Sequence, residues 1–172
     1  MAGIYHVDSK QQVTLGADWF PTDTTREGRM LSAGQLEATI TSRETGQHIT
    51  LLFKSRKRNE LGRWKRCSFR DADVVFVEFQ RMTIGWLNPK GSKIVQKMRT
   101  SDAKLAWAMQ WTLRWAAGVI DPDLAPARMQ SADRCGHCRI KLTDPQSIDR
   151  GIGPTCFGKE TQSKAAQVSL AS

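Results

Sequence analysis

The chain has 172 residues, of which 40% are hydrophobic and 25% are charged. These proportions are typical of a globular protein, and they exclude a chain that is disordered throughout. No apolar run approaches the roughly 20 residues that a transmembrane helix needs, and the first residues lack the pattern of a secretory signal. Because the chain also has only four cysteines, we expect a cytoplasmic protein without a disulfide scaffold.

The charge of the chain is strongly positive. It has 26 basic and 17 acidic residues, which give a net charge of +9. A small basic protein commonly binds a polyanion, and nucleic acid is the most common one. A basic surface that serves only solubility is the alternative interpretation.

The N-terminal part favours little regular structure. Residues 4–7 favour a short strand, and mostly polar residues follow. Asp18, Trp19, Phe20 and Pro21 then predict a loop whose two aromatic side chains pack against the main body.

The stretch from residue 36 to residue 98 has the pattern of β-strands. Apolar and polar residues alternate in it, and turn sequences such as the one at 88–91 separate the strands. Strands are predicted at residues 36–40, 49–53, 63–69, 74–79, 82–87 and 93–98. Short strands joined by such turns predict a small antiparallel sheet or a partly open barrel.

A helix is predicted over residues 101–118. Thr100 or Ser101 can cap its start, Asp102 favours its dipole, and Gly118 can end it. Tryptophans recur every four residues inside it, beside a second apolar stripe. This pattern predicts a largely buried helix that lies across one face of the sheet.

The predicted fold class is therefore α+β, with one packed helix and an appended C-terminal module that contains three of the four cysteines. Residues 1–120 form the predicted β-rich module, and residues 121–130, which contain two prolines, form a linker. Residues 131–160 are predicted to form the cysteine-containing module, and residues 161–172 a flexible tail.

Three cysteines near the C-terminus form the sharpest motif in the chain. Cys135 and Cys138 form a C-x-x-C pair, in which Gly136 is expected to permit the tight turn, and Cys156 follows a segment with two glycines and a proline. Such a pair suits tetrahedral zinc, which also supplies folding energy to a segment with few apolar residues. Residues 131–160 are therefore predicted to be a zinc-binding module of the zinc-knuckle type. A redox pair is disfavoured because no βαβ pattern accompanies the motif.

The fourth ligand of this zinc ion is left open. Asp144 carries a carboxylate, although an aspartate before proline commonly caps a turn. Ser147, His137 and water are further options, and Cys67 is expected to be a small core residue.

The segment from Cys135 to Cys156 resembles a small zinc-finger family. The matching islands are C-x-x-C, L-T-D-P-x-S and G-I-G-P-x-C, which agree in order and spacing over 22 residues. The family occurs in bacteriophage and actinobacterial proteins and beside helicase-like domains. The resemblance implies zinc held by Cys135, Cys138 and Cys156 and a phage or prophage origin, but it implies no activity.

Positive charge is concentrated in residues 54–70. This segment has eight basic residues and one acidic residue, so it carries most of the net charge. We expect its first part, residues 54–62, to be a projecting loop between two strands that binds phosphates. The candidate nucleic-acid-binding residues are Lys54, Arg56, Lys57, Arg58, Arg63, Trp64, Lys65 and Arg66. A solvated hairpin that protects a sheet edge is the alternative, and Trp64 is either a stacking residue or a core residue.

Motifs of several enzyme classes are absent from the sequence, which has no P-loop, no G-x-G-x-x-G, no H-E-x-x-H and no deaminase pattern. We therefore expect a non-enzymatic zinc protein of phage origin that binds DNA or RNA without reading its sequence, in the host cytoplasm. Lys90, Lys93, Lys97 and Arg99 are expected to extend the positive face. One alternative is a phage protein that binds and inhibits a host defence or transcription protein. Another is a zinc enzyme with an open fourth position.

Overall fold

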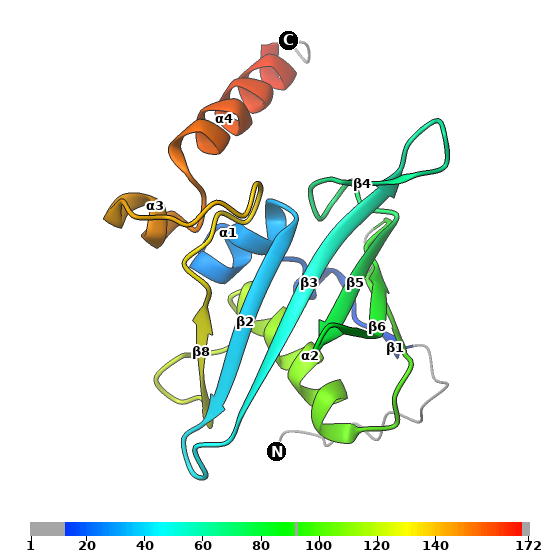
Figure 1. Cartoon of the computed structure of the whole chain (residues 1–172), viewed down its shortest axis with the longest axis vertical. Coiled ribbons are helices and arrows are strands. Elements are labelled where there is room, and N and C mark those ends of the chain that lie inside the picture. The colour runs from blue at the N-terminus through cyan, green and yellow to red at the C-terminus, as the bar shows by residue number, and fades with distance from the viewer. Residues whose placement is uncertain (1–12, 92, 170–172) are drawn as a thin grey trace.

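The computed structural model describes residues 13–91 and 93–169, and the predicted strand at 4–7 lies outside them. The α+β class is confirmed, with an open antiparallel sheet rather than a closed barrel (Figure 1). The strands are β1 (Val13–Thr14), β2 (Gln35–Ser42), β3 (His48–Arg58), β4 (Trp64–Arg66), β5 (Val74–Phe79), β6 (Met82–Asn88), β7 (Val95–Met98) and β8 (Ala127–Ser131). The helices are the 3-10 turn η1 (Ala17–Trp19), α1 (Arg26–Ser32), α2 (Ala103–Ala116), α3 (Pro145–Arg150) and α4 (Pro154–Ser169).

The strand order in the sheet is β1-β7-β6-β5-β3-β2-β8, and β4 pairs with β3 outside this path. All pairings are antiparallel, as expected for strands joined by short turns. Strand β3 continues through Arg58, so the predicted loop over residues 54–62 is wrong for its first half. The basic side chains from Lys54 to Arg58 lie on a strand rather than on a loop.

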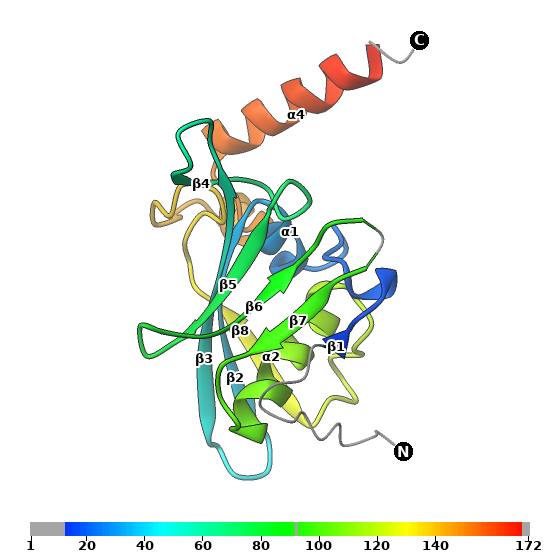
Figure 2. The ribbon, with the colours of Figure 1, turned by 90° about the vertical axis from the view of Figure 1, so that its right-hand side faces the viewer.

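The two faces of the sheet differ. One face carries the buried side chains, including Leu36, Leu51, Phe53, Val75 and Val77, and they form the main core with residues of α1 and α2. Figure 2 shows α1 and α2 on the same side of β2 and β3. The residues between them point to the opposite face, because side chains alternate along a strand. We call that opposite side the outer face.

Helix α2 is shorter than predicted at both ends. It spans Ala103–Ala116, and Gly118, at φ +74°, follows its last turn. The N-cap is Asp102 rather than Thr100 or Ser101, because the Asp102 carboxylate accepts hydrogen bonds from the amides of Lys104 (2.8 Å) and Leu105 (3.3 Å). The helix is largely buried, as the tryptophan pattern indicated.

Replacing Asp102 by alanine is expected to lower the free energy of unfolding by about 1 kcal/mol, because two amides at the start of α2 lose their acceptor. Asp102→Asn keeps an acceptor and is expected to retain most of the stability. Urea denaturation followed by circular dichroism measures both changes. Equal stability of the alanine and asparagine variants would contradict this role for Asp102.

Helix α1, strand β8 and part of α4 lie where the sequence predicted irregular structure. Helix α1 forms in the N-terminal part, where Thr25 caps it by accepting from the amide of Gly28 at 2.9 Å. Strand β8 lies in the predicted linker and pairs with β2, and α4 extends into the predicted tail as far as Ser169. Within the described residues, no helix has the length and apolar composition needed to cross a membrane.

Candidate functional site

The C-x-x-C pair lies on a tight turn after β8. The amide of Cys135 donates to the carbonyl of Ile140, and the amide of Arg139 donates back to the carbonyl of Cys135, both at 2.9 Å. Arg139 has the left-handed conformation that this turn needs, at φ +66°. Gly136, which the sequence suggested for that role, does not have a positive φ.

Cys156 approaches the pair from the other side, in the first turn of α4. Gly151 ends α3 in the left-handed conformation (φ +72°), and Pro154 is the first residue of α4. Both are favourable placements for these residue types. Together they turn the chain sharply between the two helices and deliver Cys156 to the pair. We call residues 133–156 the knuckle.

The three thiols meet at one point. The sulfur atoms of Cys135, Cys138 and Cys156 all lie within 4.8 Å of one another. Three thiolates bound tetrahedrally to zinc at about 2.3 Å would be about 3.8 Å apart, which agrees with sulfur atoms that all lie within 4.8 Å of one another. The predicted grouping of these cysteines is confirmed, and the chemistry of the donor set fits a metal ion.

The thiols differ in their electrostatic surroundings. Burial raises the pKa of Cys135, but backbone amides, led by that of Gly153 at 3.4 Å, donate to its sulfur and bring the pKa below its ordinary value. Burial and the neighbouring thiols raise the pKa of Cys156 to about 12. Cys156 therefore holds its proton more tightly than an isolated thiol, because a negative charge on its sulfur would be repelled by charge on the neighbouring sulfur atoms.

A cavity of about 220 Å³ lies beside the thiols and narrows the choice of a fourth ligand. Asp144 and Ser147 line it, whereas Cys67 lies in the main core and His137 is not among its lining residues. Asp144 caps α3 by accepting from the amide of Ser147 at 2.8 Å. The hydroxyl of Ser147 is buried and has no hydrogen-bond partner. Among the described residues, no carboxylate or imidazole joins the three thiols within 4.8 Å.

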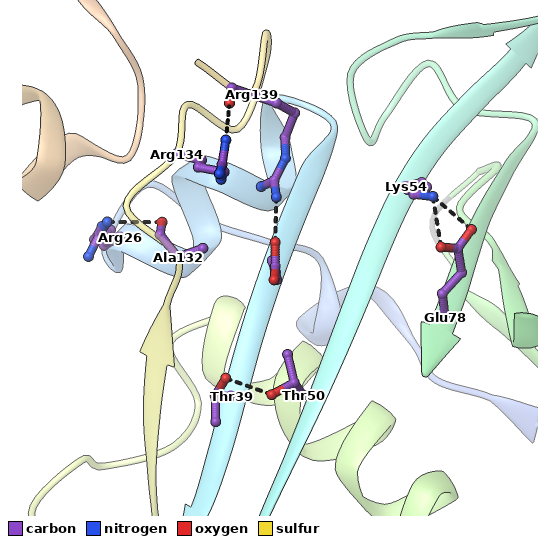
Figure 3. Close-up of polar contacts among 9 residues, drawn as sticks. Arg26, Thr39, Thr50, Lys54, Glu78, Ala132, Arg134 and Arg139 are labelled. Atoms are coloured by element: carbon purple, nitrogen blue, oxygen red, sulfur yellow. Dashed lines mark hydrogen bonds and ion pairs between the residues drawn. The ribbon is translucent and has the colours of Figure 1, made fainter. Parts of the chain in front are cut away.

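The knuckle is docked on the sheet module rather than held away from it. A Cβ atom added to Gly136 would lie 2.6 Å from the carbonyl oxygen of Met30, so the knuckle backbone touches α1 directly. Arg26 donates to the carbonyl of Ala132 at 3.2 Å, and Arg139 forms an ion pair with Glu37 of β2 (Figure 3). The knuckle and the sheet module therefore share one interface.

The predicted nucleic-acid-binding residues gather on one hairpin. Lys54, Arg56, Lys57 and Arg58 lie on β3, Arg63 lies in the turn, and Trp64, Lys65 and Arg66 lie on β4. The register places Arg56 opposite Arg66 and Lys57 opposite Lys65. Like charges directly opposite each other on paired strands are destabilising. Accordingly, burial and then the neighbouring Arg66 lower the pKa of Arg56.

Few carboxylates neutralise this hairpin. Lys54 forms an ion pair with Glu78 at 2.7 Å (Figure 3), but within the described part of the chain none of the other candidate cations has an ion-pair partner. Trp64 is 44% exposed, so it is not a core residue, and the guanidinium of Arg58 lies 4.7 Å from its ring centre. Lys90, which was expected to extend the positive face, is instead paired with Asp73 at 2.8 Å.

The hairpin also contacts the knuckle. Arg66 donates a hydrogen bond to the backbone carbonyl of His137, between the two cysteines of the pair. Sequence reasoning missed this contact because the two residues are 71 positions apart. It also missed Phe76 and Trp86, whose strand pattern alone does not show that they stand beside the cationic residues.

The family of unknown function DUF6011 matches residues 127–161. The match covers β8 and the knuckle and leaves most of the sheet outside it. No curated protein matches the chain. No solved structure matches it either.

Proposed function

We propose that this protein is a zinc-containing, non-enzymatic protein that binds nucleic acid through the phosphate backbone. The observation that carries the proposal is the register of the β3–β4 hairpin, which sets Arg56 against Arg66 and Lys57 against Lys65 without carboxylates between them. Such pairing costs stability in the free protein. Phosphates placed between the cations remove that cost and release bound counterions.

The metal has a structural role in this proposal. Cys135, Cys138 and Cys156 would hold zinc, which suits a thiolate-rich tetrahedral site and supplies folding energy. Because Arg66 contacts the knuckle backbone, a loaded knuckle also supports the base of the cationic hairpin.

The partner is DNA or RNA without sequence readout, because the cations stand on a hairpin and no helix presents a row of base-reading side chains. The resemblance of residues 135–156 to fingers of phage proteins supports an accessory role for a phage-encoded protein in the host cytoplasm.

The proposal predicts binding that weakens steeply with salt. A triple variant, Lys57→Ala, Arg63→Ala and Lys65→Ala, is expected to reduce affinity for duplex or single-stranded DNA about tenfold. It is also expected to lower the slope of log affinity against log salt by roughly one for each phosphate that the variant no longer binds. Fluorescence anisotropy with labelled DNA at several salt concentrations measures both quantities.

A matched control removes the same charge elsewhere. Lys104, Arg128 and Lys159 are exposed and lie outside the hairpin, so replacing these three by alanine is expected to leave affinity within about twofold of the wild type. Equal decreases in affinity in the two triple variants would show that the lower affinity comes from the change in net charge and not from the position of the cations. Wild-type protein that binds no nucleic acid at low salt would overturn the proposal and favour an acidic protein surface as the partner.

A further inference from the structure

The outer face of the sheet carries a row of side chains that no sequence motif predicts. The register places Lys54 of β3 opposite Phe76 of β5, Phe76 opposite Trp86 of β6, and Trp86 opposite Lys97 of β7. Residues opposite each other in a ladder share a face, so two aromatic rings stand side by side between two lysines.

These rings are not part of the core. Phe76 alternates with the buried Val75 and Val77, whereas Phe76 itself is half-buried and lies outside the core cluster. Trp86 is also half-buried and stands outside that cluster. Both rings therefore point to the face opposite α1 and α2 and contact solvent in part.

The row joins the hairpin. Trp64 packs edge-on against Phe76, with ring centres 5.7 Å apart. Guanidinium groups lie over the two tryptophans at either end, with Arg58 at 4.7 Å from the Trp64 ring and Arg99 at 5.1 Å from the Trp86 ring. We call Trp64, Phe76 and Trp86 the aromatic row.

We propose that the aromatic row binds the bases of single-stranded nucleic acid, while the adjacent cations bind its phosphates. This inference rests on the proposed function and names its substrate class. Aromatic side chains stack with any base, and nearby cations follow the backbone, as a strand without a partner requires. In a duplex the bases are already stacked on one another, so their faces are not available to these rings.

The test distinguishes binding to bases from binding to phosphates. Three labelled ligands of about 12 nucleotides are compared by anisotropy at one salt concentration: oligo(dT), an abasic strand of the same length, and a duplex. Oligo(dT) is expected to bind about tenfold more tightly than the abasic strand, which keeps the phosphates but has no bases to stack. It is also expected to bind more tightly than the duplex.

Two tryptophans of equal exposure give a matched pair of variants. Trp64→Ala is expected to weaken oligo(dT) binding about tenfold and to leave binding of the abasic strand nearly unchanged, whereas Trp64→Phe restores most of the affinity. Trp107 on α2 is 46% exposed, close to the 44% of Trp64, so Trp107→Ala is the control and is expected to bind like the wild type. Circular dichroism checks that each variant is folded.

The outcomes distinguish the two proposals. Absence of binding to all three ligands would defeat the proposed function and this inference together. Three other outcomes would overturn the aromatic row as the base-binding surface and leave phosphate binding in place. They are equal binding to oligo(dT) and the abasic strand, a preference for the duplex, and normal oligo(dT) binding by Trp64→Ala.

Discussion

Replacing Cys135 by serine is expected to remove the bound metal and to destabilise the whole chain, not only the knuckle. Cys135 is fully buried in a small cluster with Ala33, Leu142 and Ile152, and its sulfur accepts from the amide of Gly153. Because this cluster has few apolar members, we expect a metal ion bound by the three cysteines to be the main source of its folding energy. Ala33 directly follows α1, which packs on the sheet, so loss of the cluster is expected to destabilise the sheet module as well.

The size of the effect follows from the surface that the knuckle covers. Met30 is completely buried, and both Gly136 and Gly151 of the knuckle lie against it. Exposing a buried methionine costs about 1.5–3 kcal/mol, and disruption of the small cluster adds to this cost. We expect a decrease of about 3 kcal/mol in the free energy of unfolding, or about 10 °C in melting temperature for a chain of this size.

Calorimetry of the metal-loaded protein, with and without chelator, measures this effect, and elemental analysis gives the metal content. The expected content is one zinc per chain in the wild type and none in Cys135→Ser. Cys67 lies in the main core away from the cluster, so Cys67→Ala is the control and is expected to retain the metal. Full metal content in Cys135→Ser, or a melting temperature that chelator leaves unchanged, would contradict this account.

Gly136→Ala is expected to separate docking of the knuckle from metal binding. The added Cβ would lie 2.6 Å from the Met30 oxygen and 2.8 Å from the Met30 Cα, and both of these atoms belong to the backbone. Because α1 is packed on both sides, it cannot yield without disturbing the core, and overpacking of this kind costs about 3 kcal/mol. The three cysteines remain, so the variant is expected to melt about 10 °C lower while keeping its zinc.

Gly158→Ala is the matched control for this change. Gly158 lies in α4 with no atom within 4 Å of an added Cβ, so alanine there is expected to raise stability by up to about 1 kcal/mol through its helix propensity. Calorimetry with metal analysis measures both variants. A wild-type melting temperature in Gly136→Ala would show that the knuckle does not depend on close contact with α1.

The knuckle was predictable because its cysteines and its turn-forming residues lie close together in the sequence. Cys135 and Cys138 belong to one tight turn, and the glycines and proline before Cys156 provide the second turn that the site requires. The same reasoning misplaced the turn-forming residue, because Gly136 serves close packing on Met30 and Arg139 takes the left-handed conformation. The position of a glycine in the sequence does not show whether it is there for close packing or for a left-handed backbone conformation.

The elements that the sequence analysis did not predict are short and have only a weak sequence pattern. Strand β8 has only five residues, and pairing with β2 stabilises it where the preceding prolines suggested a linker. Helix α1 has seven residues, and its position depends on close contact of Gly28 with the backbone of Thr22 and Ala116. In both cases tertiary contacts override weak local propensity.

The sequence by itself determined the antiparallel strands, the buried tryptophan helix, the grouping of the three cysteines and the concentration of positive charge near residue 60, because each depends on residues close together along the chain. Only the tertiary structure decided which cations face each other, that Arg66 contacts the knuckle, and that Phe76 and Trp86 form a row beside Trp64. Those relations depend on strand order and register, which arise from packing between distant segments.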